Sequence, residues 1–295
     1  MGIPRQSRTP PGNGTRTGIL STRCGNLVCL GNESGTICRV TRETKNILVY
    51  TAPFATWIAL QTFLPATAEA YAIRSAATLL AAIPLICRGF ANLKSWISNF
   101  NSPCRKTQAD GGDNADGNHA NGGSWGWLWA GGGIQTLVGI LGGLLVLALW
   151  ILPESSDFYC KWFVWPIGSL PALSSALPPY CPIRCGWPLT IAKLIGSAFI
   201  IAPVEEFFFR SFLYRWLQNR DFLAVPLAHF DLSALLWTIF LFTLEHDRPL
   251  AAALCGLIYG LLAIRFGLLS AIVAHVTTNL LLAVYVIVCG QWNFW

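Results

Sequence analysis

Residues 187–218 read WPLTIAKLIGSAFIIAPVEEFFFRSFLYRWLQ, and this stretch decides the fold of the chain. It is apolar enough to enter a lipid bilayer, yet it carries Glu205, Glu206 and Arg210 close together. A charged side chain at the centre of a membrane helix costs about 2.5–3.5 kcal/mol on insertion scales. Three such side chains in one apolar helix therefore indicate a functional site within a membrane protein.

Helical spacing pairs two of these charges. Glu206 and Arg210 are four residues apart and share one helix face, so the carboxylate can accept hydrogen bonds from the guanidinium. Each charge then offsets part of the other's burial cost. The simplest interpretation of this pair is structural.

Glu205 lies about 100° round the helix from Glu206 and has no partner within its own helix. Pro203, two residues earlier, removes a backbone donor and loosens the helix beside this acid, which leaves room for a water molecule. A carboxylate among aromatic rings is the kind of group that proteins tune for general-base catalysis near neutral pH. The rings expected on its face are Phe208, Phe209 and Phe212.

The overall composition is that of a membrane protein. Of the 295 residues, 54% are hydrophobic and only 12% are charged, against roughly 25% charged in soluble domains. We therefore predict an all-α, polytopic transmembrane helical bundle of about seven spans, with membrane lipid as a partner. The net charge of +6 comes from loops and the N-terminal arm, which is typical of the positive-inside pattern and not of nucleic-acid binding.

The chain divides into four regions by composition. Residues 1–45 form a basic arm that we predict to be disordered, and 46–91 contain the first two spans. A Gly/Asn-rich linker covers 92–126, and 127–295 form a transmembrane core that carries the polar motifs. The Lys and Arg residues of the loops place the N-terminus in the cytoplasm and the C-terminus outside, and we expect the inner (cytoplasmic) membrane of a bacterium.

Two later spans also carry polar side chains at helical spacing. Phe242 and His246 are four residues apart, as are His275 and Asn279. Polar groups in membrane spans turn towards the bundle interior, so these side chains are expected to meet Glu205. Each of them alone could be a buried, hydrogen-bonded side chain without a function. Together they form a set that can activate a water molecule and stabilise an oxyanion.

Three motifs in this order resemble a known family. VEEFFFR fits E-E-x-x-x-R, FTLEH fits F-x-x-x-H, and HVTTN fits H-x-x-x-N. The chain resembles the CPBP family over residues 189–295; this family contains the type II CAAX prenyl proteases and bacterial relatives known as intramembrane glutamic proteases. The surrounding sequence, EHDRPLAAALCGLIYG and the segment from HVTTN to the C-terminus, also resembles a bacterial CAAX-protease-related subgroup found with exosortase systems.

The resemblance implies an integral-membrane endopeptidase that needs no metal or other cofactor. Glu205 and His246 would activate the attacking water, and His275 and Asn279 would hold the oxyanion. The substrate would be a membrane-associated protein or peptide, with lipidated and membrane-anchored proteins included in that class. Supporting positions match at Glu206, Arg210 and Phe242.

Two other interpretations stay open at this point. A zinc protease could use Glu205, His246 and His275 as ligands, although the H-E-x-x-H helix motif is absent. The second is a membrane protein without catalytic activity, such as a scaffold, a bacteriocin-immunity protein or a transporter with an intramembrane proton site. Internal repeats would favour a transporter, and the sequence has none.

Overall fold

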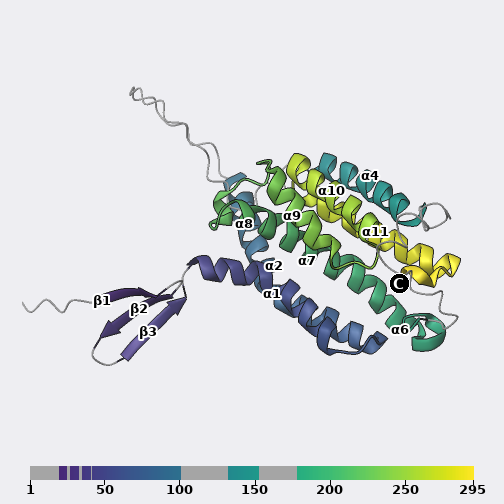
Figure 1. Cartoon of the computed structure of the whole chain (residues 1–295), viewed down its shortest axis with the longest axis horizontal. Helices are drawn as coiled ribbons and strands as arrows, with labels where there is room; N and C mark the ends of the chain where they lie inside the picture. Colours follow the sequence, from purple (N-terminus) through teal and green to yellow (C-terminus); the bar gives the residue numbers. More distant parts are fainter. Residues whose placement is uncertain (1–19, 25–26, 33–34, 41, 101–131, 153–177) are drawn as a thin grey trace, which may run out of the picture. The chain divides into compact units, whose positions relative to one another are not determined.

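A computed structural model describes residues 20–24, 27–32, 35–40, 42–100, 132–152 and 178–295. The chain forms two compact units, Met1–Asn46 and Ile47–Trp295, which are described separately below. The first contains a small sheet and the second a helical bundle (Figure 1).

The first unit contains three strands, β1 (Leu20–Cys24), β2 (Leu27–Asn32) and β3 (Gly35–Val40), paired antiparallel in that order. The sequence predicted disorder throughout residues 1–45, so the prediction missed this sheet. The missed signal is Gly25–Asn26, a two-residue pair typical of tight hairpins, between two short runs of apolar and β-branched residues. The prediction had given weight only to the polar, Gly-rich composition.

The second unit confirms the predicted membrane bundle. Five of its helices are long and apolar enough to cross a membrane. Its seven helical segments, counted over the described residues, are α1 (Arg42–Phe63), α2 (Ala68–Phe100), α4 (Gly132–Ile151), the segment Pro182–Gln218, α9 (Leu232–Thr243), α10 (Pro249–Phe266) and α11 (Leu268–Cys289).

Helix α2 extends beyond its predicted end. It continues through Phe100, so helix covers the first residues of the predicted 92–126 linker. The segment 91–100 contains neither Gly nor Pro, and Pro103 is the first strong helix breaker after it. The remainder of the predicted linker, 101–126, lies outside the described residues.

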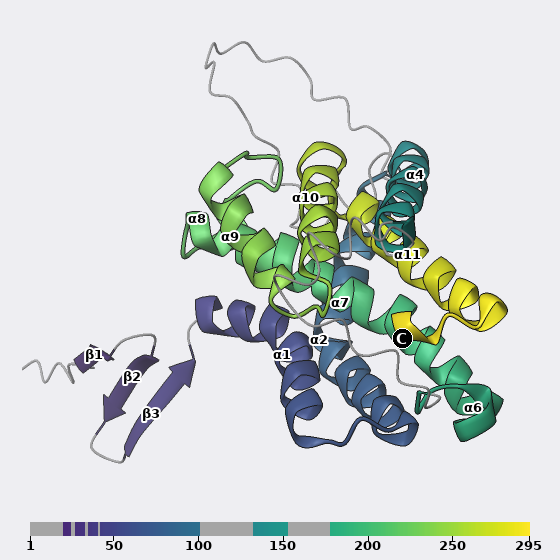
Figure 2. The same ribbon diagram turned by 45° about the vertical axis from the view of Figure 1, so that its right-hand side comes forward.

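Helix α4 packs closely against α11, and the two lie side by side in both views (Figures 1 and 2). Glycine makes this approach possible: a Cβ atom on Gly143 would lie 2.5 Å from the carbonyl oxygen of Ala274. A Cβ atom on Gly139 would lie 2.8 Å from the carbonyl oxygen of Ser270. The small-residue face therefore meets α11, as the Gly139 and Gly143 spacing suggests. Leucine and isoleucine side chains of α4 remain exposed, as expected beside lipid.

The segment Pro182–Gln218 alternates between α-helical and wider π-helical turns. The π-helical stretches η3 (Gly196–Ile201) and η4 (Phe207–Leu213) flank the short α7 (Ala202–Glu206). The outer parts are α6 (Pro182–Ile195) and α8 (Tyr214–Gln218). Pro203 has no N–H to donate, which fits a rearranged hydrogen-bond ladder immediately before it. The two glutamates thus lie on one regular turn between two irregular ones.

Helix α9 is short and is followed by a break before α10. Its start is fixed by Asp231, whose carboxylate accepts a hydrogen bond from the backbone N–H of Ala234 at 2.8 Å. The helix ends at Thr243, and α10 begins at Pro249. His246 therefore lies in an irregular connection beyond the end of α9, and not within the span to which its spacing from Phe242 had assigned it.

The contact between α4 and α11 leads to a stability prediction. Gly143→Val should destabilise the protein by about 1–3 kcal/mol, because the added side chain would overlap the backbone of α11. Thermal unfolding of detergent-purified protein measures the effect. Gly133→Val is the matched control on the same helix, since nothing lies within 4 Å of a Cβ atom there. Equal unfolding temperatures for the two variants would contradict the packing described.

Candidate active site

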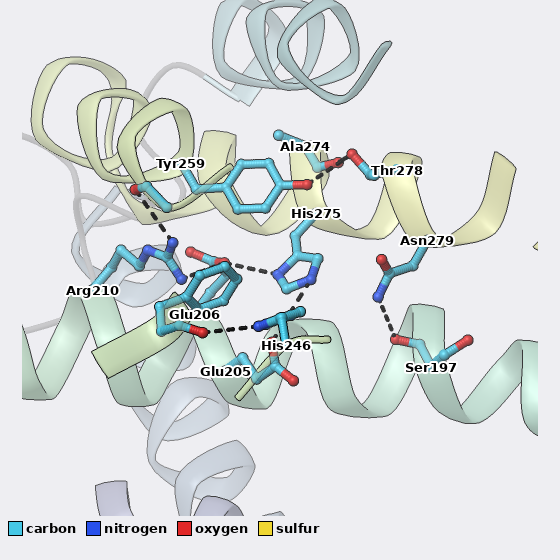
Figure 3. A network of polar contacts seen from close by, with 12 residues as sticks. Ser197, Glu205, Glu206, Arg210, His246, Tyr259, Ala274, His275, Thr278 and Asn279 are labelled. Atoms are coloured by element: carbon cyan, nitrogen blue, oxygen red, sulfur yellow. Dashed lines mark hydrogen bonds and ion pairs between the residues drawn. The ribbon is translucent and has the colours of Figure 1, made fainter. Parts of the chain in front are cut away.

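The polar residues singled out from the sequence meet in the interior of the bundle (Figure 3). Glu205 and Glu206 come from α7, His246 from the connection between α9 and α10, and His275 and Asn279 from α11. Glu205, His246, His275 and Asn279 line one cavity of about 230 Å³. Segments far apart in the sequence thus contribute to a single site.

Glu206 is completely buried and contacts two cationic or protonatable partners. Arg210 donates from Nη1 to Glu206 Oε1 at 3.0 Å, which is the ion pair predicted from their spacing. His275 Nδ1 lies 2.8 Å from the same oxygen. The ionised carboxylate accepts both hydrogen bonds, so Nδ1 of His275 is the protonated nitrogen. Glu206 therefore orients His275, a role that sequence spacing did not reveal.

The imidazole of His275 is also held by an aromatic ring that stacks on its face. The Tyr259 ring of α10 stacks on it, with centroids 4.8 Å apart. Tyr259 donates its hydroxyl hydrogen to Thr278 Oγ1 at 2.8 Å. Thr278 Oγ1 lies 3.0 Å from the carbonyl oxygen of Gly143 on α4. Three helices thus hold the ring in one orientation, with Nε2 directed towards Glu205 at 3.8 Å from its Oε2.

Glu205 differs from Glu206 in its surroundings. Its side chain is almost fully buried, and its Oε2 forms no hydrogen bond with any residue that the structure describes. A buried carboxylate oxygen without a donor is rare, because losing hydration without compensation is costly. Oε2 of Glu206 also lacks a donor among the described residues, but Glu206 is not one of the described residues that line the cavity. Glu205 is therefore the acid that presents a free acceptor atom to the cavity.

His246 presents one free nitrogen to the cavity. Its Nδ1 lies 2.8 Å from the carbonyl oxygen of Phe242, which can only accept, so Nδ1 carries the hydrogen and Nε2 has a lone pair. His246 lies outside the spanning helices, and loss of hydration lowers its pKa to about 4, so the ring is neutral at pH 7. The neighbouring Glu245 lies in the same connection, and loss of hydration raises its pKa to about 8.

Asn279 lies one helical turn beyond His275. Its Nδ2 donates to the carbonyl oxygen of Ser197 at 3.1 Å, a bond that joins α11 to η3. One hydrogen of the amide nitrogen is used in this bond, and the other remains available. The side chain also lines the cavity, next to the space that Glu205 faces.

Phe242 covers the buried guanidinium of Arg210. The guanidinium carbon lies 4.5 Å from the Phe242 ring centroid and 5.6 Å from that of Tyr259. Arg210 Nη2 also donates to the carbonyl oxygen of Gly256 at 3.4 Å. Aromatic faces stabilise a cation that is removed from water. All seven residues selected from the sequence are thus brought into one region.

Sequence reasoning missed Tyr259, Thr278 and Ser197. Tyr259 is a hydroxyl-bearing ring within the apolar run of α10, and polar groups in spans are themselves a signal for the bundle interior. Thr278 lies within HVTTN, between two residues that were selected. Ser197 takes part through its backbone carbonyl, which no side-chain pattern could indicate.

The residues in this region do not form a ready metal site. The described part of the chain holds no group of three or more His, Cys, Asp or Glu side chains placed to bind a metal ion. Both His275 and Glu206 already use polar atoms in bonds to each other. The zinc site proposed as an alternative, with Glu205, His246 and His275 as ligands, would need a different arrangement of these side chains.

The contacts of Glu206 generate a stability prediction. Glu206→Ala should destabilise the protein by about 3–5 kcal/mol, because it leaves the buried guanidinium of Arg210 without a counter-ion. Thermal unfolding and the yield of folded protein measure this effect. The double variant Glu206→Ala with Arg210→Met should regain part of the loss, since it removes the unpaired charge as well. A single variant as stable as the native chain would show that the ion pair contributes nothing.

Comparison with known proteins supports the motif-based resemblance. A family model described as type II CAAX prenyl endopeptidase Rce1-like matches residues 187–281, a range that includes all three motifs. No curated protein and no solved structure matches the chain. The association with exosortase systems stays a prediction. The site-bearing part of the chain, residues 187–281, is thus similar to the Rce1-like type II CAAX prenyl endopeptidases, a family of membrane proteases.

Proposed function

We propose that the protein is an intramembrane endopeptidase that hydrolyses a peptide bond with a water molecule activated by Glu205 and His246. The observation that carries this proposal is the buried Oε2 of Glu205, which has no hydrogen-bond donor among the described residues and faces the cavity shared with His246. A general base needs a free acceptor atom next to space for a water molecule. Glu205 meets both conditions.

In the first step, water would lose a proton to Glu205 while its oxygen attacks the carbonyl carbon of the substrate. Nε2 of His246 offers a second acceptor that orients the water, because Nδ1–H is bound to the carbonyl of Phe242. The tetrahedral intermediate would then collapse, and the proton held by Glu205 would pass to the leaving amine nitrogen. No covalent intermediate with the enzyme is required.

The developing oxyanion would be stabilised by His275 and Asn279. Glu206 accepts the Nδ1 hydrogen of His275 and leaves Nε2 directed towards the cavity, where an Nε2–H would donate to the oxyanion. Asn279 retains one amide hydrogen beyond the bond to Ser197. Both side chains are held by bonds to other helices, which provides the fixed donor geometry that such stabilisation requires.

The surroundings support a substrate that reaches the site from the membrane. Five helices of the described part are long and apolar enough to span a membrane, and the matched family is described as type II CAAX prenyl endopeptidases. A membrane-associated protein or peptide is therefore the proposed substrate class, with lipid-modified chains included. We expect the protein in the inner (cytoplasmic) membrane of a bacterium.

Glu205→Gln should reduce peptide cleavage by about 100- to 10,000-fold, because the amide cannot accept a proton from water. Cleavage of a quenched peptide library by detergent-solubilised protein measures this. Glu69→Gln, at an exposed carboxylate in the first turn of α2, is the matched control and should retain full activity. Native unfolding temperatures for both variants would exclude a folding defect. Full activity of Glu205→Gln would refute the proposed base.

Treatment with a chelator distinguishes the glutamic mechanism from the zinc alternative. We expect cleavage to survive chelation, because the proposed reaction uses only protein side chains and water. Metal content of the purified protein should be measured in parallel. Stoichiometric zinc together with chelator-sensitive cleavage would instead favour a metalloprotease. A protein that contains no metal and cleaves no member of the library would favour a non-catalytic scaffold.

A further inference from the structure

Two cations that the proposed reaction does not use contact the same aromatic ring. Lys193 Nζ of α6 lies 4.2 Å from the ring centroid of Tyr71, and Arg74 Cζ of α2 lies 5.4 Å from it. Each also contacts a second ring: Lys193 Nζ is 4.6 Å from Tyr180, and Arg74 Cζ is 5.2 Å from Trp57. The result is a pair of basic side chains packed against aromatic rings within the bundle.

Neither cation has an acidic partner in the described part of the chain. Neither Arg74 nor Lys193 forms an ion pair with any residue that the structure describes. Arg74 is 5% exposed, and its Nε has no hydrogen-bond partner among the described residues. Aromatic faces offset only part of the cost of burying a charge. Two neighbouring cations without a carboxylate therefore form a site prepared for an anion.

One member of this pair, Lys193, lines the cavity of the candidate active site. Lys193 and Ser197 line that cavity together with Glu205, His246 and Asn279. Among its described lining residues, Lys193 alone is a lysine or arginine. Asn279, which donates to the carbonyl of Ser197, lines the same cavity. An anionic group bound at Lys193 would thus belong to a molecule that also reaches Glu205.

We propose that Lys193, which contacts the Tyr71 ring together with Arg74, binds a carboxylate of the peptide substrate and so determines substrate specificity. This carboxylate is either the C-terminus of the peptide or an acidic side chain near it. The inference rests on the proposed protease function but concerns binding, so it can be tested without hydrolysis. Lys193 is a specificity residue here, since it lies away from the reacting atoms.

Binding should be measured in the inactive Glu205→Gln background with a fluorescent peptide library prepared as free acids and as C-terminal amides. Free acids should bind about 10- to 100-fold more tightly than amides, the gain expected for a charge-assisted hydrogen bond. Adding Lys193→Met should abolish this difference and leave binding of the amides nearly unchanged. Restored binding of amides that carry an Asp or Glu side chain would identify the side chain as the source of the carboxylate.

Lys45→Met, at an exposed lysine in the first turn of α1, is the matched control and should keep the preference for free acids. With the active chain, Lys193→Met should raise KM for acidic peptides and leave kcat largely unchanged. Equal loss of binding for acids and amides would assign Lys193 a structural role and overturn the inference. Lack of acid preference in the Glu205→Gln chain would also overturn it, as would Lys193-dependent binding confined to phosphatidylglycerol vesicles.

Discussion

The arrangement of the site depends on one buried carboxylate, that of Glu206. It accepts hydrogen bonds from Arg210 on its own segment and from His275 on α11, a residue 69 positions away. In an apolar interior each of these polar groups would be costly alone, and together they compensate one another. The contact fixes how α7 and α11 face each other, and it fixes the tautomer of His275. Glu205 takes no part in these hydrogen bonds, so its carboxylate remains available to accept a proton.

Lys193 and Glu205 line the same cavity because the helical segment that carries them is irregular. In a uniform α-helix, twelve positions turn by about 1200°, so Lys193 would point roughly 120° away from Glu205. The structure has both side chains lining one cavity, and the π-helical turns of η3 lie between them. Wider turns change the angular position of every residue that follows, which is one reason why such turns occur at functional sites. Arguments from regular spacing therefore hold within α7 and fail across η3.

This distinction explains how much the sequence could predict. Local spacing correctly predicted the Glu206–Arg210 ion pair, and the apolar composition correctly predicted the bundle class, because neither depends on how distant helices pack. Local spacing could not predict the contact of Glu206 with His275 or the stacking of Tyr259 on that ring. Both contacts depend on how distant helices pack against each other, and the spacing of residues within one helix does not predict that packing. The same limit concealed the pair of cations formed by α2 and α6.

Helix α4 illustrates how packing without reactive groups contributes to the site. The Gly143 position lets α4 approach α11 so closely that its carbonyl oxygen lies 3.0 Å from Thr278 Oγ1. Thr278 in turn accepts the hydroxyl hydrogen of Tyr259, whose ring stacks on His275. A larger residue at position 143 would separate the helices and leave that carbonyl without its partner. The orientation of the imidazole thus depends both on the charge of Glu206 and on the absence of a side chain at a glycine, which lies on a helix that carries none of the proposed catalytic groups.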